Sequence, residues 1–257
     1  MGLVIGLIEL AVCLGVFFLI GLRGWPGAND DCLDTQPNTC YCERLRTGKM
    51  VLQPINTWTN VGYMAVGLAI LAVLPSLSSA NPMAGPDLYS VGLGMVIIFL
   101  GPGSMFFHAS MKAWGGWIDN ISMNLFISWV ALYDVFRMVH GSDLLFSVAW
   151  LLVNGVIGAF LIAYLRKGYG KWVFAGLIGF YLLTSVLVAL SVGGVHRDFG
   201  WLIVALAVFS VAFAIQQLSQ TNRPLCFPDS WFQGHGLWHL MTALAAGSIF
   251  LYLLTET

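Results

Sequence analysis

The chain has little charge. Asp, Glu, Lys and Arg make up 9% of its 257 residues, whereas soluble domains carry about 25%. So few charges cannot form the hydrated shell that a soluble domain needs, and 58% of the residues are hydrophobic. The chain also lacks a basic tract and a low-complexity segment, so no nucleic-acid-binding surface is indicated. The composition predicts an integral membrane protein built as one bundle of helices.

Familiar cysteine motifs are also missing. The five cysteines are Cys13, Cys32, Cys40, Cys42 and Cys226. Their spacing contains neither CxxC nor the paired spacing of a zinc finger, which disfavours a cysteine metal site. We interpret them as free thiols or as one disulfide between loops.

The chain contains long apolar runs. Eight of them approach the roughly 20 residues that a helix needs to cross a bilayer. They cover residues 3–22, 55–76, 88–110, 118–138, 144–165, 172–192, 199–218 and 232–254. Short polar joints separate all but the first two, so neighbouring helices should run antiparallel. The first run lacks a preceding basic segment and a following cleavage site, which favours an extra N-terminal span over a signal peptide.

Positive charges gather on one side of this predicted bundle. Only Arg137 and Arg197 fall on the side away from the long loop 23–54. The other nine of the eleven are Arg23, Arg44, Arg46, Lys49, Lys112, Arg166, Lys167, Lys171 and Arg223. Because Lys and Arg are enriched in cytoplasmic loops, the count predicts that the long-loop side faces the cytoplasm.

Five residues with useful chemistry fall near that same side. Ser104 and His108 end the third run, and Asp119 begins the fourth. His235 and His239 begin the eighth run. Antiparallel packing therefore puts all five at one depth in the membrane. Ionisable groups at such positions usually serve function.

The spacing of these residues indicates a metal site. Ser104 with His108, and His235 with His239, are four residues apart and so share a helix face. Two such imidazoles can hold one metal ion, as in HExxH helices, although Gly236 replaces the glutamate of that motif. Three histidines that leave a fourth position to water form a catalytic type of zinc site. Zinc lowers the pKa of bound water to about 7.

Simpler interpretations exist for single residues. A histidine in a span can hydrogen-bond a neighbouring helix, and a serine such as Ser104 often packs helices. Asp134 and Arg137 are three residues apart and are expected to pair with each other. His140 and His196 fall in loops on the far side, where solvation is expected.

As a set, the five residues resemble the alkaline ceramidase family, part of a wider group of seven-span hydrolases that includes the adiponectin-receptor-like proteins. The resemblance covers residues 40–254 in order and with similar spacing, and Asn56-Thr-Trp-Thr-Asn60 is similar to the family's Asn-Thr-x-Ser-Asn. That segment opens the family's first span. The resemblance thus implies an all-α integral membrane protein with an extra N-terminal hydrophobic helix (1–22), a polar loop (23–54) and a seven-transmembrane helix bundle (55–257).

The resemblance also implies a reaction. Zinc would be held by His108, His235 and His239. Asp119 would serve as general base and acid, and Ser104 would help to hold the oxyanion. The substrate would be a ceramide-like lipid, whose amide is hydrolysed to a sphingoid base and a free fatty acid.

The loop departs from the family in its metal motif. Eukaryotic members bind calcium through Asp-Trp-x-Glu-x-Asn and a later Glu, and this chain has Cys40-Tyr-Cys-Glu43-Arg-Leu45 and then Gln53. Only Glu43 matches, so the motif does not predict a calcium site, and Asp30, Asp31 or Asp34 would have to rebuild one.

The family can also join this loop to the one before the last span, which here would pair Cys42 (or Cys40) with Cys226. Since the charge count places both loops in the cytoplasm, where disulfides rarely persist, the sequence favours free thiols.

Three functions stay open from the sequence. The chain could be a ceramidase-like zinc amidase, a zinc hydrolase of another N-acyl or ester lipid, or a receptor or scaffold whose metal only staples helices. Structural zinc sites usually have four protein ligands. Because only three histidines are apparent, the sequence favours catalysis.

Overall fold

The computed structural model is a bundle of long helices. It describes residues 1–35, 40–77, 80–164, 169–190 and 194–257. The long helices are α1 (Gly2–Arg23), α4 (Val61–Val73), α5 (Leu88–Ser110), α6 (Ala113–Met138), α7 (Asp143–Tyr164), α8 (Gly170–Ala189), α9 (Gly200–Leu218) and α10 (Gly234–Leu254). The short ones are α2 (Asp31–Thr35), α3 (Pro54–Trp58) and the 3-10 turn η1 (Leu74–Ser76).

The helices confirm the predicted all-α membrane protein. In the described part of the chain, seven helical segments are long and apolar enough to cross a membrane: α1, the α3–η1 segment Pro54–Ser76, α5, α7, α8, α9 and α10. α6 has 26 residues but is more polar than these, because it carries Asp119, Asp134 and Arg137. All eight predicted runs fall on helices; the predicted ends at 165 and 192 lie outside the described residues.

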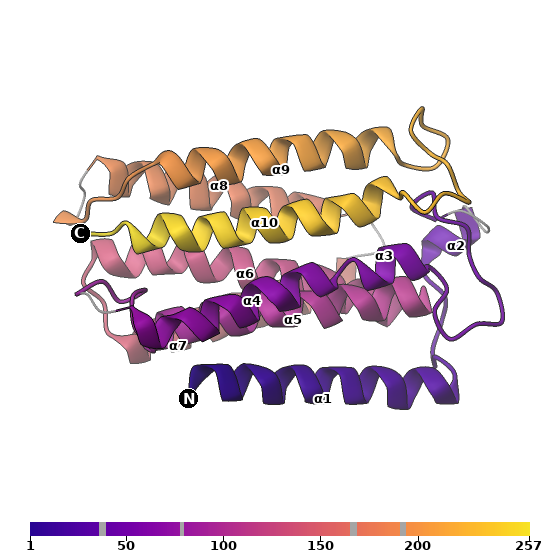
Figure 1. Ribbon diagram of the computed structural model, residues 1–257, viewed down its shortest axis with the longest axis horizontal. Coiled ribbons are helices and arrows are strands. Elements are labelled where there is room, and N and C mark those ends of the chain that lie inside the picture. Colours follow the sequence, from indigo (N-terminus) through magenta and orange to yellow (C-terminus); the bar gives the residue numbers. More distant parts are fainter. Residues whose placement is uncertain (36–39, 78–79, 165–168, 191–193) are drawn as a thin grey trace.

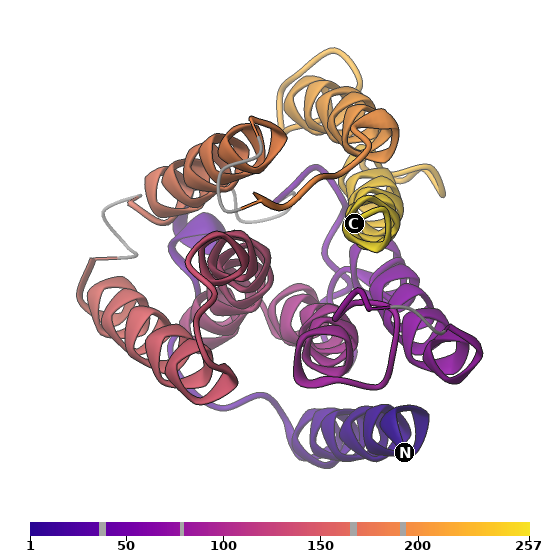
Figure 2. The same ribbon diagram turned by 90° about the vertical axis from the view of Figure 1, so that its left-hand side faces the viewer.

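Helix α5 lies at the centre of the bundle. It packs against α1, α3, α4 and α6. In its most apolar stretch 78% of the residues are buried, compared with 11% for α1. α1 lies along one edge of the bundle, against α4 and α5 (Figures 1 and 2). Its outer face is apolar and exposed, as expected for a helix that contacts lipid.

Two glycines bring other helices close to α5 just before Ser104. A Cβ on Gly101 would lie 2.9 Å from the carbonyl oxygen of Asn60, at the start of α4. A Cβ on Gly103 would lie 2.7 Å from the Cβ of Ser122 in α6. Both contacts require glycine, because side-chain carbons do not approach other atoms so closely. The helix itself continues through Pro102.

Two disulfides fix the polar loop 23–54. They join Cys32 with Cys40 and Cys42 with Cys226, and Cys13 is a free cysteine. The expectation of free thiols is therefore wrong for four of the five cysteines, whereas the pairing of Cys42 with Cys226 that the resemblance implied is present. Spacing in the sequence could not reveal that Cys226 comes to lie beside the loop, 184 positions after Cys42.

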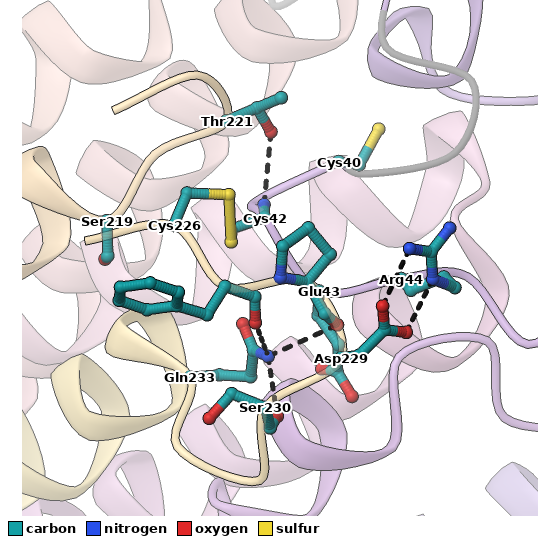
Figure 3. Close-up of a disulfide and its surroundings, with 12 residues drawn as sticks. Cys40, Cys42, Glu43, Arg44, Ser219, Thr221, Cys226, Asp229, Ser230 and Gln233 are labelled. Atoms are coloured by element: carbon teal, nitrogen blue, oxygen red, sulfur yellow. Dashed lines mark hydrogen bonds and ion pairs between the residues drawn. A yellow bond between two sulfur atoms is a disulfide. The ribbon is translucent and has the colours of Figure 1, made fainter. Parts of the chain in front are cut away.

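The second disulfide joins the polar loop to the loop 219–233, which precedes α10 (Figure 3). Beside it, Arg44 and Asp229 form a two-pronged ion pair with distances of 2.6 and 2.7 Å. The backbone N–H of Arg44 also donates to the carbonyl of Pro228 at 3.0 Å. The two loops thus form one cap over one end of the bundle, and both chain termini lie at the other end (Figure 1).

At that other end, charged side chains form a buried network. Arg197 contacts Asp134 and Glu256, and Arg137 contacts Glu256 at 2.6 Å. The predicted pairing of Asp134 with Arg137 is therefore wrong. Helical spacing allowed it, but the interior position of Arg197 gives Asp134 a closer cationic partner. His140 and His196 are exposed, as predicted.

Candidate metal centre

Three histidines meet inside the bundle, beneath the cap of the two loops. His108 lies in the last turn of α5, and His235 and His239 lie on one face of the first two turns of α10. Their side chains are buried, with exposed fractions of 0, 8 and 3%. One ring nitrogen from each lies within 4.8 Å of the others, and the two Nε2 atoms of His108 and His235 are 3.1 Å apart. Such a group can hold a metal ion.

The outer nitrogens of two of these rings contact the residues that flank α3. The Nδ1 atom of His108 is 2.8 Å from the Oε1 atom of Gln53, and the Nδ1 atom of His239 is 3.1 Å from the Oγ1 atom of Thr59. Metal-binding histidines usually donate their second ring N–H to such a partner. The Nε2 atoms of His108 and His239 are then free to bind an ion.

Sequence reasoning missed these two partners. Thr59 entered only as part of the Asn-Thr-Trp-Thr-Asn segment, and Gln53 only as a departure from the calcium motif. A signal was present, since the polar residues between Gln53 and Asn60 open an otherwise apolar span. Their role was hidden because it depends on contact with residues 55 and 180 positions away.

Tyr41 covers the histidines from the loop side. Its ring lies 4.6 Å from the ring of His235, centroid to centroid. Tyr41 and Cys42 have φ values of 54° and 70°, which non-glycine residues adopt rarely. Disulfides on Cys40 and Cys42 fix this turn on both sides. Burial raises the pKa of Tyr41, and the nearby charge of Asp119 raises it further, so the phenol keeps its proton and can donate a hydrogen bond. Sequence reasoning did not identify it.

A cavity of about 620 Å³ adjoins the histidines. Its polar end is lined by Tyr41, Ser104, Asp119, His235 and His239. Most of its other walls come from α6, α8, α9 and α10, and they include the polar side chains of Lys171, Gln216 and Gln217. A narrower and almost entirely apolar pocket shares Phe174, Phe209 and Trp238 with it and continues between the same four helices. Cavities of this size are typical of sites for small organic ligands.

The structure brings the five predicted site residues to one space. Ser104 lies in α5 and Asp119 lies in α6. They line the cavity together with His235 and His239. A carboxylate can accept a proton and a hydroxyl can donate a hydrogen bond. The arrangement can therefore support proton transfer beside a bound metal ion.

The residues at the calcium motif do not fit a calcium ion. The carboxylate of Glu43 accepts the N–H groups of Ile55 and Asn56, each at 2.8 Å. The Nε2 atom of Gln53 donates to the carbonyl of Cys40, and it lies 3.4 Å from the carbonyl of Glu43. Calcium needs six to eight oxygen ligands, and here N–H groups occupy the oxygens that could provide them.

The loop aspartates do not supply an alternative site. The Oδ1 atom of Asp30 accepts the N–H of Cys32 at 3.0 Å. Within the residues that the structure describes, Asp30 and Asp31 do not belong to a group of His, Cys, Asp or Glu side chains able to hold a metal ion. The side chain of Asp34 lies outside the described part.

Comparison with known protein families gives a match over most of the chain. Residues 38–256 match the family model described as Ceramidase. The matched region begins just before the turn that carries Tyr41 and extends past the end of α10, so it contains the three histidines and leaves α1 outside. A comparison with curated proteins found no match.

Proposed function

Because this chain belongs to the ceramidase family, hydrolases that act on the amide of ceramide, we propose that it is an intramembrane zinc-dependent amidase. It would cleave the N-acyl bond of ceramide-like lipids to a sphingoid base and a free fatty acid. One observation carries the proposal: three buried histidines lie beside Asp119 and Ser104 at the polar end of a cavity of about 620 Å³.

The donor set fits zinc. Imidazole nitrogen is a preferred zinc ligand, and three protein ligands are typical of catalytic sites. Within the described residues, the group able to hold an ion consists of His108, His235 and His239. When bound, the ion would supply Lewis-acid activation of water and of the amide carbonyl.

The side chains in the cavity account for the proton transfers. Asp119 accepts a proton from the water whose oxygen forms a bond to the amide carbon. It then delivers that proton to the amide nitrogen as the C–N bond breaks, which yields a free amine and a carboxylic acid. The hydroxyl of Ser104 donates to the carbonyl oxygen while negative charge develops on it.

The shape of the cavity supports a lipid substrate. The amide would lie at the polar end, beside His235 and His239, and the hydrocarbon chains would lie against the apolar walls of α8 and α9. Large apolar side chains are exposed on the outer faces of α7, α8 and α9, which suits contact with a bilayer. A lipid can therefore reach this site from within the membrane.

Metal removal tests the proposal. Purified protein should contain zinc and release fatty acid from ceramide; stripping the metal should abolish turnover, and added zinc should restore it. The variant His239→Ala should lose both zinc and turnover, because it removes one of three ligands. The variant His140→Ala replaces an exposed histidine at the far end and should retain both.

A lipid panel separates the alternatives. Faster release from other N-acyl lipids or from esters would keep the zinc hydrolase and change the substrate. A zinc-loaded protein that turns over no lipid in the panel would point to a receptor or scaffold with a structural metal, and would contradict the proposal.

The side of the membrane on which the site opens is a separate question. The charge count predicts the cytoplasmic side; Arg166 and Lys167, two of its nine residues, lie outside the described part. Two disulfides in the capping loops count against it, because disulfides persist mainly in oxidising compartments. We give the disulfides more weight, because one of them fixes the polar loop and the other joins it to the loop before α10.

We therefore expect the cap to be reached from the non-cytoplasmic side. In sealed vesicles of known orientation, a membrane-impermeant reductant followed by an impermeant maleimide should label Cys42 and Cys226 only from that side. Cys42→Ser/Cys226→Ser protein is the control, because it removes this disulfide. Labelling confined to the cytoplasmic side would restore the prediction from the charges.

A further inference from the structure

The side chain of Gln53 connects the capping loop to one of the three histidines. It is fully buried. Its Nε2 atom donates to the carbonyl of Cys40 and approaches that of Glu43, and its Oε1 atom lies 2.8 Å from the Nδ1 atom of His108. Its backbone N–H also donates to the carbonyl of His108 at 3.2 Å. Gln53 therefore holds both the backbone and the ring of His108.

These partners decide which way the amide of Gln53 faces. Carbonyl oxygens only accept hydrogen bonds, so the NH₂ group must face Cys40 and Glu43. The amide oxygen then faces His108, whose Nδ1 atom must carry the proton. In a neutral imidazole the other nitrogen, Nε2, then has the free lone pair. This is the nitrogen that lies 3.1 Å from the Nε2 atom of His235, inside the histidine group.

We propose that Gln53 is a positioning residue that takes over the role of a calcium ion in this loop, so that the metal centre forms without calcium. The proposal rests on the metal site of the proposed function. Two amide hydrogens satisfy loop carbonyls that a cation would otherwise hold, and the amide oxygen fixes the tautomer of His108. Outer partners of this kind tune metal affinity.

A glutamine and a glutamate at position 53 differ in charge, and this charge decides whether the loop needs a cation. A glutamate there would place carboxylate oxygens against the carbonyls of Cys40 and Glu43, where no hydrogen would separate them. Burying an uncompensated carboxylate among acceptors is strongly unfavourable, so a glutamate would need either a proton or a cation between the groups, and only an ionised glutamate with a bound cation responds to calcium. Glutamine needs none, because it provides its own donors.

Two disulfides also hold the loop where a bound cation would otherwise do so. Cys40, whose carbonyl accepts the Gln53 amide, is bonded to Cys32, and Cys42 is bonded to Cys226. The turn that presents the carbonyls is thus fixed on both sides without a metal. Glu43 is also satisfied within the protein, because its carboxylate caps the N-terminus of α3 through Ile55 and Asn56.

The test compares Gln53→Glu with Gln220→Glu, which makes the same change at a partly exposed position in the loop after α9. Each protein is loaded with zinc in resin-treated, calcium-free buffer, and its melting temperature is measured before and after addition of calcium or, as a cation control, magnesium. Wild type and Gln220→Glu should not respond to calcium. Gln53→Glu should melt about 5–10 °C lower without calcium and should recover when calcium is added.

A second measurement detects positioning rather than stability alone. The absorption spectrum of the cobalt-substituted protein reports the geometry around the ion. Gln53→Glu without calcium should show a changed spectrum and a metal affinity lower by about 10–100-fold. If this variant does not fold, Gln53→Asn keeps an amide but is too short to reach His108 and the loop carbonyls together, and it should show the same loss.

Two results would overturn the inference. One is a shift of the melting temperature or of the cobalt spectrum of wild type on addition of calcium. The other is a wild-type spectrum and metal affinity in the Gln53 variants. None of these measurements requires lipid turnover. A wild-type protein that binds neither zinc nor cobalt would contradict the proposed function instead, so the two failures are distinguishable.

Discussion

Replacing Asp119 with asparagine should lower the turnover of a ceramide-like lipid by about 10²–10⁴-fold and leave the bound metal in place. Asp119 lines the cavity together with Ser104. Asparagine has nearly the same shape, but its amide cannot take the proton of the attacking water. The change therefore removes proton transfer and keeps the packing of the site.

The measurement is fatty acid release at saturating lipid, together with the zinc content of the same preparation. Asp198→Asn is a matched control, because Asp198 is exposed and lies just before α9 at the far end of the bundle. It should retain full turnover. An Asp119→Asn protein that keeps its zinc and hydrolyses lipid at the wild-type rate would remove Asp119 from the mechanism.

The largest loss of stability is expected from Arg197→Met. The guanidinium of Arg197 is fully buried between Asp134 and Glu256. Without it, the buried carboxylate of Asp134 loses its cationic partner and Glu256 keeps only Arg137, and removing one partner of a buried ion pair costs about 3–5 kcal/mol. Thr184 and Ser185 of α8 donate to the same Asp134 at 3.0 and 3.1 Å, so the loss should extend to a helix that forms the cavity wall.

Thermal unfolding in detergent measures this effect. For a chain of this size a loss of 3–5 kcal/mol lowers the melting temperature by roughly 6–20 °C. Arg223→Met, at an exposed position in the loop before α10, should change it by less than about 2 °C. If the two variants have the same melting temperature, the charged network does not stabilise this end of the bundle.

Much of the fold could be predicted because a bilayer restricts the possible structures. Backbone groups in lipid must bond within the chain, so apolar runs of about 20 residues become helices. The regular spacing of residues on helices also predicted which residues gather at the candidate site. The four-residue spacing of His235 and His239 put both on one face of α10, and the alternation of spans put His108 and Asp119 at the same depth.

The contacts that the sequence did not reveal join residues far apart in the chain. Helical spacing favoured Arg137 as the partner of Asp134, yet Asp134 binds Arg197, 63 positions away. Likewise, nothing near Gln53 indicates that its amide reaches His108. The resemblance implied that Cys42 (or Cys40) pairs with Cys226, but the charge count placed both loops in the cytoplasm and so favoured free thiols. Periodicity tells which face a residue occupies, but not which neighbour it meets.

The bond between Cys42 and Cys226 has a consequence for the order of biosynthesis. Tyr41 and Gln53 come from the first quarter of the chain, and two of the three histidines come from its last helix. The bond that fixes the cap cannot form until Cys226 has been synthesised. A nascent or truncated chain without α10 therefore lacks both the complete cap and two of the three histidines. On the proposed function, such a chain could not hydrolyse the lipids around it.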